Sequence, residues 1–416
     1  MAPVGCWESL AAAIQAGADS VYFGIEHLNM RARSSVNFTT ADLHQIAATC
    51  KKAGVRTYLT VNTVMYPEDL PLMRKIVDNA CDAGVDAIIA SDISVMQYCN
   101  RKEMEVHLST QLNTANTEAL RFYAQFADVV VLARELNMQQ VANIHRDIIE
   151  QDICGRKGEP VRIEMFCHGA LCMAVSGKCY LSLNNLGMSA NRGACAQICR
   201  RGYIVKDRES DLELEVDNQY IMSPKDLKTI RFLDKMLDAG VRVLKIEGRA
   251  RGPEYVKTVV ECYKEAVNTY VQGKWKQITE EKFTKWDERL AQVFNRGFWD
   301  GWYQGQTLGE WNDSHGNKAT RRKVYAGHCT NYFHKPQVAE FLIEAHVVKE
   351  GDELLITGET TGAYECAANH IRVFENDKTQ AERTGVTEAP QGTLLCIKTD
   401  SVIRRGDKLY IWDCLE

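Results

Sequence analysis

The sequence predicts an α/β fold, a (β/α)8 TIM-like barrel followed by a small C-terminal β-barrel domain. Three observations predict this arrangement. Strand-like and helix-like segments alternate up to about residue 250, four helix-like segments end in a similar glycine pattern, and short strands with turn residues take over from residue 323. Repeated strand–helix units favour parallel strands, and eight such units close a barrel.

The strand candidates of the barrel are short, apolar and rich in β-branched residues. They cover residues 1–4, 20–25, 56–61, 87–91, 106–110, 128–133, 162–166 and 241–246. Amphipathic segments at 8–16, 42–53, 70–83 and 227–239 precede Gly17, Gly54, Gly84 and Gly240. Glycine in the left-handed conformation ends a helix at such a position, and the next strand then begins at once. An open doubly wound sheet is the alternative, but no glycine-rich dinucleotide turn follows the first strand.

The rest of the chain divides into a helix, a connecting segment and a β-rich part. Pro253 suits the first turn of a helix over 253–272, which Gly273 ends. We predict a barrel over 1–272, a helical or irregular connecting segment over 273–324, and a C-terminal β-barrel domain over 325–416. Two similar phrases, 348–354 (VKEGDEL) and 403–409 (IRRGDKL), predict equivalent hairpins in that domain.

The composition is that of a globular protein, with 45% apolar and 25% charged residues. A net charge of −5 argues against a strongly basic protein that coats nucleic acid. We expect no membrane partner, because no apolar run is long enough to span a bilayer. Without a recognisable secretory signal, we expect a cytoplasmic protein. A reducing compartment disfavours disulfides and favours metal-binding or catalytic cysteines.

Four cysteines, Cys172, Cys179, Cys195 and Cys199, follow the strand candidate at 162–166 with the spacing C-x6-C-x15-C-x3-C. In a (β/α)8 barrel the loops after the strands form the active face. No Asp or Glu occurs between residues 165 and 206, whereas five basic residues do. These are Lys178, Arg192, Arg200, Arg201 and Lys206. Such a positive field is expected to stabilise thiolates and to attract an anionic substrate.

Several kinds of chemistry use four such thiols. Four thiolates can make a closed zinc site, but zinc ribbons favour two CxxC knuckles. Widely spaced thiolates fit an iron–sulfur cluster better, although spacing alone leaves both open. A disulfide pair, one reactive thiol with bystanders, and simple packing are the other interpretations. For Cys154 and Cys167 we expect packing.

Motifs along most of the chain resemble the peptidase U32 family, also known as collagenase-like peptidases. The strongest are 164–172 (EMFCHGALC), 176–182 (SGKCYLS) and 191–195 (NRGAC). The others are 2–5 (APVG), 17–24 (GADSVYFG), 108–111 (LSTQ), 133–136 (AREL), 223–227 (SPKDL), 245–249 (KIEGR) and 294–298 (FNRGF). Together these motifs are highly specific.

The resemblance implies an enzyme, and the family includes both proteases and oxygen-independent hydroxylases that carry a 4Fe–4S cluster. One branch forms 5-hydroxyuridine in tRNA, another hydroxylates a cytidine of ribosomal RNA, and a third acts in ubiquinone synthesis. The RNA branches take the hydroxyl group from prephenate, and members with a C-terminal β-domain are most similar to them. Many relatives have a cysteine at the position of Lys228. The resemblance therefore implies either Cys199 as fourth ligand beside Cys172, Cys179 and Cys195, or an incomplete cluster in this protein.

We favour the hydroxylase over the peptidase. The sequence has neither His-Glu-x-x-His nor Gly-x-Ser-x-Gly. A Cys172 nucleophile with His168 as base is conceivable, but it leaves the other three cysteines without a role. A non-catalytic RNA-binding factor is the third hypothesis. The basic residues Arg321, Arg322 and Lys323 precede the C-terminal domain, where they form either a charged linker or part of an RNA contact.

Further residues are candidates for catalysis and for binding tRNA or a small anionic co-substrate. The catalytic candidates are His168, Glu164 and Arg249. The substrate-binding candidates are His107, Ser109, Gln111, Arg134, Arg192, Arg200, Lys245 and Glu247. The cations Arg192, Arg200, Lys245 and Arg249 are expected to bind carboxylates or phosphates. Arginine in particular suits planar, bidentate anions.

Each of these candidates also has a structural interpretation. Arg249 can pair with Glu247 or another carboxylate at the top of the barrel, and Glu164 inside a barrel needs a partner such as Arg134. His107 and Ser109 share one strand face, which suits either substrate contact or a hydrogen-bonded core histidine. His168 is expected to donate a proton or to support the cluster from behind.

Overall fold

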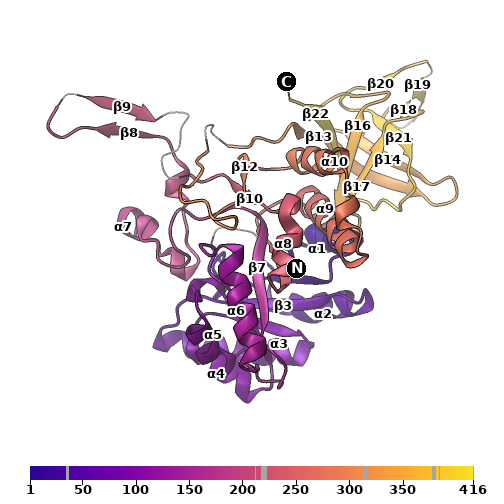
Figure 1. The fold of residues 1–416 in the computed structure, drawn as a ribbon. Helices are drawn as coiled ribbons and strands as arrows, with labels where there is room; N and C mark the ends of the chain where they lie inside the picture. The colour runs from indigo at the N-terminus through magenta and orange to yellow at the C-terminus, as the bar shows by residue number, and fades with distance from the viewer. Residues whose placement is uncertain are drawn as a thin grey trace.

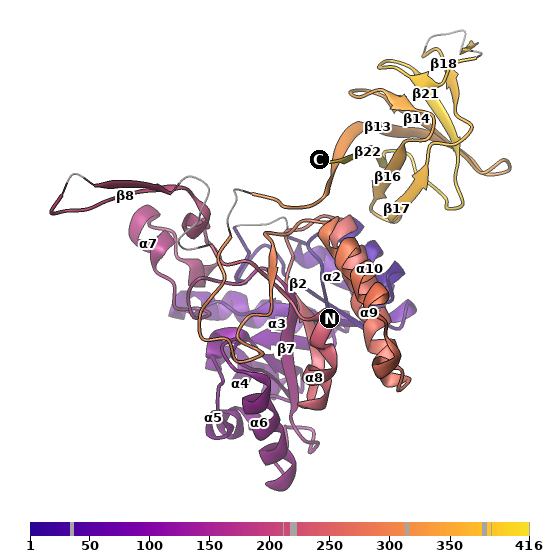
Figure 2. The same cartoon turned by 45° about the horizontal axis from the view of Figure 1, so that its top comes forward.

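The computed structural model describes residues 1–33, 37–210, 212–216, 223–312, 316–376, 381–383 and 385–415. It contains an α/β part built on parallel strands and an antiparallel sheet at the C-terminus (Figures 1 and 2). Each part has its own buried apolar core. Within these residues no helix combines the length and apolarity that a membrane span requires.

Eight parallel strands form the main sheet, seven of them in chain order. They are β1 (Ala2–Pro3), β2 (Ser20–Phe23), β3 (Arg56–Val61), β4 (Ala87–Ala90), β5 (Glu105–Leu108), β6 (Val129–Val131), β7 (Arg162–Gly169) and β11 (Val241–Ile246). The predicted strands are therefore confirmed. β11 pairs with β7, and the Ile246 amide donates to the Met1 carbonyl over 3.2 Å, beside β1. No strand ladder joins β11 to β1 among the described residues, so closure of the sheet into a barrel stays a prediction.

Helices connect most of these strands and cover the sheet (Figure 1). They are α1 (Trp7–Gln15), α2 (Leu43–Lys52), α3 (Leu70–Ala83), α4 (Ile93–Arg101), α5 (Thr117–Ala124), α6 (Met138–Glu150) and α8 (Leu233–Asp238). Gly17, Gly54, Gly84 and Gly240 all have positive φ, as predicted. Without a Cβ they make the left-handed turn from helix to strand at little steric cost.

The predicted helix over 227–239 is wrong in its first half. Residues Asp226–Lys228 form a strand, β10, which pairs antiparallel with β7, and the helix α8 begins only at Leu233. β10 also pairs in parallel with β12 (Phe298–Trp299), which lies in the segment that the sequence leaves undefined. The same segment contains α10 (Glu280–Ala291), which packs against α9 (Pro253–Val271). Contacts with distant strands and helices thus order this segment.

The C-terminal part is an eight-stranded antiparallel sheet with an additional two-stranded sheet, β15–β20. Its strands are β13 (Arg321–Phe333), β14 (Val338–Ile343), β15 (Val348–Lys349), β16 (Glu353–Gly358), β17 (Gly362–Ala367), β18 (Arg372–Phe374), β19 (Glu382–Arg383), β20 (Glu388–Ala389), β21 (Leu394–Lys398) and β22 (Lys408–Cys414). The two similar Gly-Asp phrases precede β16 and β22, which pair with each other.

The basic residues before this domain belong to its first strand. Arg321, Arg322 and Lys323 begin β13, and each has a carboxylate partner. Lys323 reaches Glu254 of α9 over 2.9 Å and so joins the two parts of the molecule. Each of the three charges thus has a carboxylate partner within the protein.

The segment between β7 and β10 leaves the main body. It contains α7 (Leu181–Leu186) and the strands β8 (Tyr203–Lys206) and β9 (Glu213–Val216). The β8–β9 hairpin projects away from both sheets in Figures 1 and 2. All four cysteines of the predicted cluster lie in this segment, before the hairpin.

Candidate functional site

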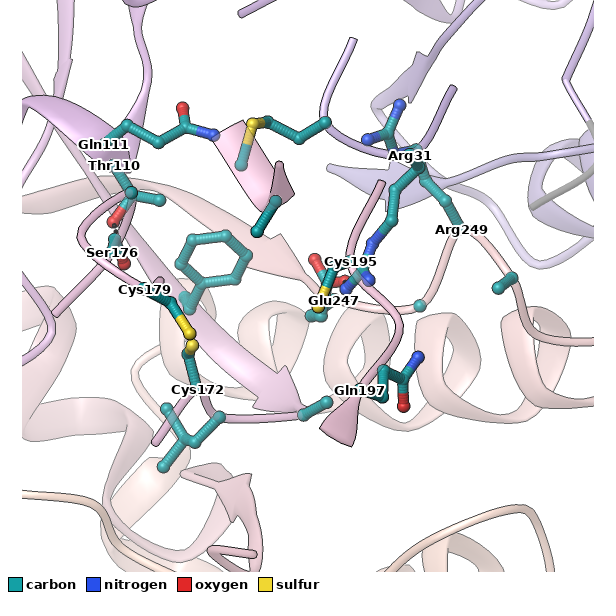
Figure 3. A pocket seen from close by; sticks show the side chains of 18 of the residues that line it. Arg31, Thr110, Gln111, Cys172, Ser176, Cys179, Cys195, Gln197, Glu247 and Arg249 are labelled. Atoms are coloured by element: carbon teal, nitrogen blue, oxygen red, sulfur yellow. Dashed lines mark hydrogen bonds and ion pairs between the residues drawn. The ribbon is translucent and has the colours of Figure 1, made fainter. Parts of the chain in front are cut away.

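A cavity of about 270 Å³ lies where the carboxyl ends of the parallel strands meet the cysteine segment. Tyr22, Thr60 and Ile89 contribute from β2, β3 and β4, and Phe166 contributes from β7. The other wall belongs to the segment after β7, which returns over the strand ends. Side chains from both walls reach into the same space in Figure 3.

All four cysteines of the series line this cavity. Cys199 is half-buried, and burial raises the pKa of its thiol. Arg200 opposes this shift, whereas negative charge on Cys172, Cys195 and Cys179 adds to it. The structure therefore brings Cys199 within electrostatic reach of the other three thiols. The positive field predicted to stabilise thiolates is outweighed by burial at Cys199.

The spacing of the thiols bears on the kind of metal group they suit. Within the described part of the chain, no three His, Cys, Asp or Glu side chains are arranged so that they could hold one metal ion. A cubane cluster presents separate iron atoms to its thiolates, so its ligands stand further apart than those of one tetrahedral ion. The four thiols around one cavity are the donor type that a 4Fe–4S cluster takes.

Positive charge dominates the cavity lining. Seven cationic side chains face two carboxylates, those of Asp226 and Glu247. The cations are Arg31, Arg134, Arg200, Lys245, Arg249, Arg251 and Arg296. An excess of positive charge in a partly enclosed space attracts anionic ligands.

Polar side chains form one wall of the cavity. The Asn62 amide donates to the Ser109 hydroxyl over 3.2 Å and to the Gln111 amide oxygen over 3.3 Å, and Ser109 also contacts Gln111. Both predicted residues therefore line the cavity. Together the three side chains present amide and hydroxyl groups that can both donate and accept hydrogen bonds.

Arg249 lies in the cavity wall but does not form the expected pair with Glu247. Its guanidinium donates to Thr60 over 2.9 Å and to Asn29 over 3.2 Å. Glu247 pairs instead with Arg31 over 3.0 Å. Burial by itself would raise the pKa of Glu247, but Arg31, Arg134 and Arg249 hold it below its usual range. Glu247 is thus a carboxylate paired with Arg31 and stabilised by the charges of Arg134 and Arg249.

The predicted pair of Glu164 with Arg134 is also wrong. Glu164 is fully buried and pairs with Lys245 of β11 over 2.7 Å. His107 lies 3.3 Å from its other oxygen and 3.1 Å from Glu105. Arg134 lies over the ring of Phe166 and donates to the Ala170 carbonyl over 3.3 Å. Lys245 and Arg134 line the cavity, whereas Glu164 and His107 form a charged network beneath it.

Two further candidates do not line the cavity. His168 is 1% exposed among Tyr255, Tyr263 and Phe298, and burial lowers its pKa to about 3. His168 is therefore neutral at neutral pH and cannot act as an imidazolium acid, and its ring packs among these three aromatic rings. Arg192 pairs with Asp69 and lies over Tyr66 outside the cavity.

Arg200 and Lys228 have different roles. Arg200 lines the cavity but uses its guanidinium to hold the loop, donating to Leu171, Ser223 and Pro224 over 2.6 to 3.0 Å. Lys228 lies outside the cavity lining and pairs with Asp287 of α10 over 2.6 Å. Lys228 thus attaches β10 to α10.

Several cavity residues are absent from the sequence-based set. Asp226, Arg251 and Arg296 lie in or beside the 223–227, 245–249 and 294–298 motifs, which could have pointed to them. Arg31 and Asn62 had no such signal. Cys167 is fully buried, as expected for a packing residue. Cys154 is only partly buried and its thiol donates to the Asp152 carboxylate over 3.3 Å, so the expected packing role is not confirmed there.

Comparison with known proteins places this site in a family. The family model "Peptidase family U32" matches residues 5–313. A protein named "Collagenase" from Porphyromonas gingivalis is 61% identical over 413 residues, covering 99% of this chain and 97% of the relative. The "tRNA hydroxylation protein P1" of Bacillus subtilis is 32% identical over 371 residues, covering 86% of this chain and 83% of the relative.

A third relative, a 23S rRNA 5-hydroxycytidine synthase of Escherichia coli, is 32% identical over 261 residues. The match covers 62% of this chain and 38% of that larger protein. Relatives named for peptide hydrolysis and relatives named for RNA hydroxylation therefore share this sequence pattern. The match to the family model spans most of the chain and both walls of the cavity. The chain belongs to peptidase family U32.

Proposed function

We propose that this protein is an oxygen-independent, iron–sulfur-dependent RNA hydroxylase. In this proposal it forms 5-hydroxyuridine in tRNA and takes the hydroxyl group from prephenate. The observation that carries the proposal is the cavity itself, in which four cysteines and an excess of cations share one enclosed space. Relatives at about 32% identity with RNA-hydroxylation names support the choice of substrate class.

In this proposal Cys172, Cys179, Cys195 and Cys199 hold a 4Fe–4S cluster. Bound there, the cluster would supply redox-active iron at the wall of the cavity. The surrounding protein holds the cysteine loop in position. Arg200 donates hydrogen bonds that connect this loop to the ends of β7 and β10. The buried Glu164–Lys245 pair keeps β7 and β11 in register. The predicted (β/α)8 barrel places such loops at its active face.

The polar wall suits the target base. Asn62 and Gln111 carry amide groups that can both donate to and accept from a pyrimidine edge. Tyr22 and Phe166 add aromatic surface to the cavity. Enzymes that modify a base within RNA take it out of the stack into such a pocket. A cavity of about 270 Å³ holds one base and a small co-substrate group rather than a folded strand.

Anaerobic purification tests the cluster directly. We expect brown protein with iron and sulfide in equal amounts, and tRNA that gains 5-hydroxyuridine when incubated with the protein and prephenate. Cys199→Ala should lose the iron and the modification, as should Cys172→Ala and Cys195→Ala. Cys414→Ala is the matched control, because Cys414 is exposed at the end of β22, outside the cavity. Full iron content in Cys199→Ala would contradict the ligand assignment.

A collagenase-like peptidase is the second candidate, favoured by the name of the 61% identical relative. A cysteine nucleophile there would need a base, and His168 does not line the cavity. Peptide cleavage that survives removal of iron would establish this function instead. The third candidate is a non-catalytic RNA-binding factor, which would bind RNA, remain free of iron and leave the RNA unmodified.

A further inference from the structure

Three arginines and one carboxylate form a cluster at one side of the cavity. Arg200, Arg251, Arg296 and Asp226 all line it, and they come from four separate segments of the chain. Asp226 is 3% exposed. Three cations around one anion leave the cluster with a net charge of about +2, which is costly to maintain in a buried place without a further anion.

Hydrogen bonds within the cluster are incomplete. The Arg296 Nη1 atom and the Asp226 Oδ1 atom lie 3.5 Å apart as an ion pair, but neither makes a well-formed hydrogen bond although both are buried. Buried polar atoms are nearly always paired, so such atoms beside a cavity indicate a missing partner. A ligand oxygen would satisfy the donor on Arg296.

Arg251 is held in place by an aromatic ring rather than by a carboxylate. Its guanidinium carbon lies 3.3 Å from the centre of the Phe294 ring, and Arg296 lies 4.9 Å from the same centre. Among the residues that the structure describes, Arg251 has no ion-pair partner. Burial and the nearby Arg296 lower the pKa of Arg251 to about 10, so it remains charged at neutral pH. Two guanidinium groups are thus fixed on Phe294.

Arg200 differs from these two because its donors already hold Leu171, Ser223 and Pro224. It contributes positive charge and joins the cluster to the cysteine segment, since Cys199 precedes it directly in the chain. Whatever binds at Arg251 and Arg296 therefore lies close to the cysteines.

We propose that Arg251 and Arg296 bind a carboxylate of a small organic dianion that enters the cavity beside the four cysteines. This assignment rests on the proposed hydroxylase function, in which such an acid is the hydroxyl donor. Two guanidinium groups match the planar, two-oxygen geometry of a carboxylate. The dianion offsets the net positive charge of Arg200, Arg251, Arg296 and Asp226.

Size favours a small acid over the RNA backbone. The cavity of about 270 Å³ lies just below the range of ~300–1,000 Å³ typical of small-molecule sites. A phosphodiester within a strand brings two nucleosides with it, which exceed this space. The arginine cluster is thus expected to bind the small co-substrate and not the nucleic acid.

Binding without turnover tests the assignment. Prephenate is titrated calorimetrically into the anaerobically purified full-length protein, with inorganic phosphate and a short oligouridylate as separate competitors. We expect Arg251→Met and Arg296→Met to weaken prephenate binding about tenfold or more. Arg242→Met should bind as the unchanged protein does, because Arg242 is exposed on β11 outside the cavity. Phosphate should compete with prephenate, and oligouridylate should not.

Asp226→Asn is expected to change prephenate affinity in the opposite direction to the arginine variants. The alternative is that Arg296 only neutralises Asp226. In that case Arg296→Met should destabilise the fold, the double variant Asp226→Asn/Arg296→Met should recover that stability, and neither variant should change prephenate affinity. Our proposal predicts instead that Asp226→Asn tightens prephenate binding, because it removes the negative charge that pairs with Arg296, and that the double variant still binds weakly. Unchanged affinity in both arginine variants, or displacement by oligouridylate, would overturn the assignment.

The result is separable from the hydroxylase function. If the unchanged protein hydroxylates tRNA but prephenate binding does not depend on Arg251 and Arg296, the arginine site is wrong and the hydroxylase function stands. Arginine-dependent binding of prephenate without any hydroxylation would retain the anion site and remove the function.

Discussion

Buried charges show how single residues depend on partners that are distant in sequence. Glu164 on β7 meets Lys245 on β11, 81 positions further along the chain. Burial by itself would raise the pKa of Glu164, but Lys245 and His107 lower it to about 2. The carboxylate therefore stays ionised beneath the cavity. The predicted partner, Arg134, was wrong because the pairing of β7 with β11 determines which side chains meet, and the sequence alone does not show that pairing.

Replacement of Lys245 should show how much the Glu164–Lys245 pair contributes to the free energy of unfolding. We expect Lys245→Met to lower the free energy of unfolding by about 3–5 kcal/mol, because it leaves the fully buried Glu164 without its strongest partner. The double variant Glu164→Gln/Lys245→Met should recover most of that loss. Urea unfolding followed by circular dichroism measures both. Additive losses in the double variant would show that the pair is not coupled.

Glu105 should make the protein sensitive to acid. Burial by itself would raise its pKa, but His107 and Lys157 lower it to about 2. A carboxyl group whose pKa is lowered on folding stabilises the protein above about pH 4.5, and that contribution is lost as the pH falls toward 2. We expect Glu105→Gln to lose up to about 3 kcal/mol at pH 7 but much less at pH 3. Urea unfolding at both pH values measures the difference; equal losses at both would contradict it.

At the scale of elements, the cysteine segment depends on how closely it approaches the loop after β2. Gly193 has a φ of 82°, and a Cβ there would lie 2.4 Å from the Asn29 carbonyl oxygen. The Gly193 carbonyl in turn accepts from the Arg33 amide over 3.1 Å. The segment thus packs backbone against backbone just before Cys195. Only glycine permits this approach.

Gly193→Ala should therefore move the cysteine loop. We expect a clear fall in the midpoint of thermal unfolding and the loss of most bound iron. Gly187→Ala is the matched control in the same segment, because Gly187 also has a positive φ, of 64°, but has open space around its Cβ position. It should cost only about 1–2 kcal/mol of backbone strain and keep its iron. Equal unfolding midpoints and equal iron content in the two variants would contradict the role of close packing at Gly193.

At the scale of the whole molecule, the C-terminal sheet is attached to the α/β part through α1 and α9. Ala12 of α1 packs against Leu355, Ala363 and Trp412. Gln15 and Lys257 each donate to backbone carbonyls at the start of β17 over 2.9 Å. This interface is small, apolar at its centre and charged at its edge. It joins two cores that are otherwise separate.

Ala12→Glu should uncouple the two parts. A charge buried at this contact without a partner costs several kcal/mol, which the interface cannot absorb. We expect differential scanning calorimetry to resolve two unfolding transitions where the unchanged protein has one. Ala48→Glu on the exposed face of α2 is the control and should keep one transition. A single transition at a lower temperature in Ala12→Glu would mean that the two parts unfold together.

The parallel strands and the cysteine site could be predicted because each depends on local pattern. Short apolar runs, glycine helix ends and the absence of acids around the thiols are all visible along the chain. The helix expected over 227–239 was wrong because β10 pairs with β7 and β12, contacts that local periodicity does not record. Arg31 and Asn62 were missed for the same reason, since nothing in their own neighbourhoods indicates the cavity.

The sequence by itself determined the α/β order of the strands, the family and the four clustered thiols, because these depend on neighbouring residues and on their spacing. Only the tertiary structure decided which charges meet. It paired Glu164 with Lys245 and Glu247 with Arg31, buried His168 away from the cavity, and gathered Arg251, Arg296 and Asp226 beside the cysteines. Electrostatic partners act over a few ångströms in space, and the return of distant segments to one sheet edge sets those distances.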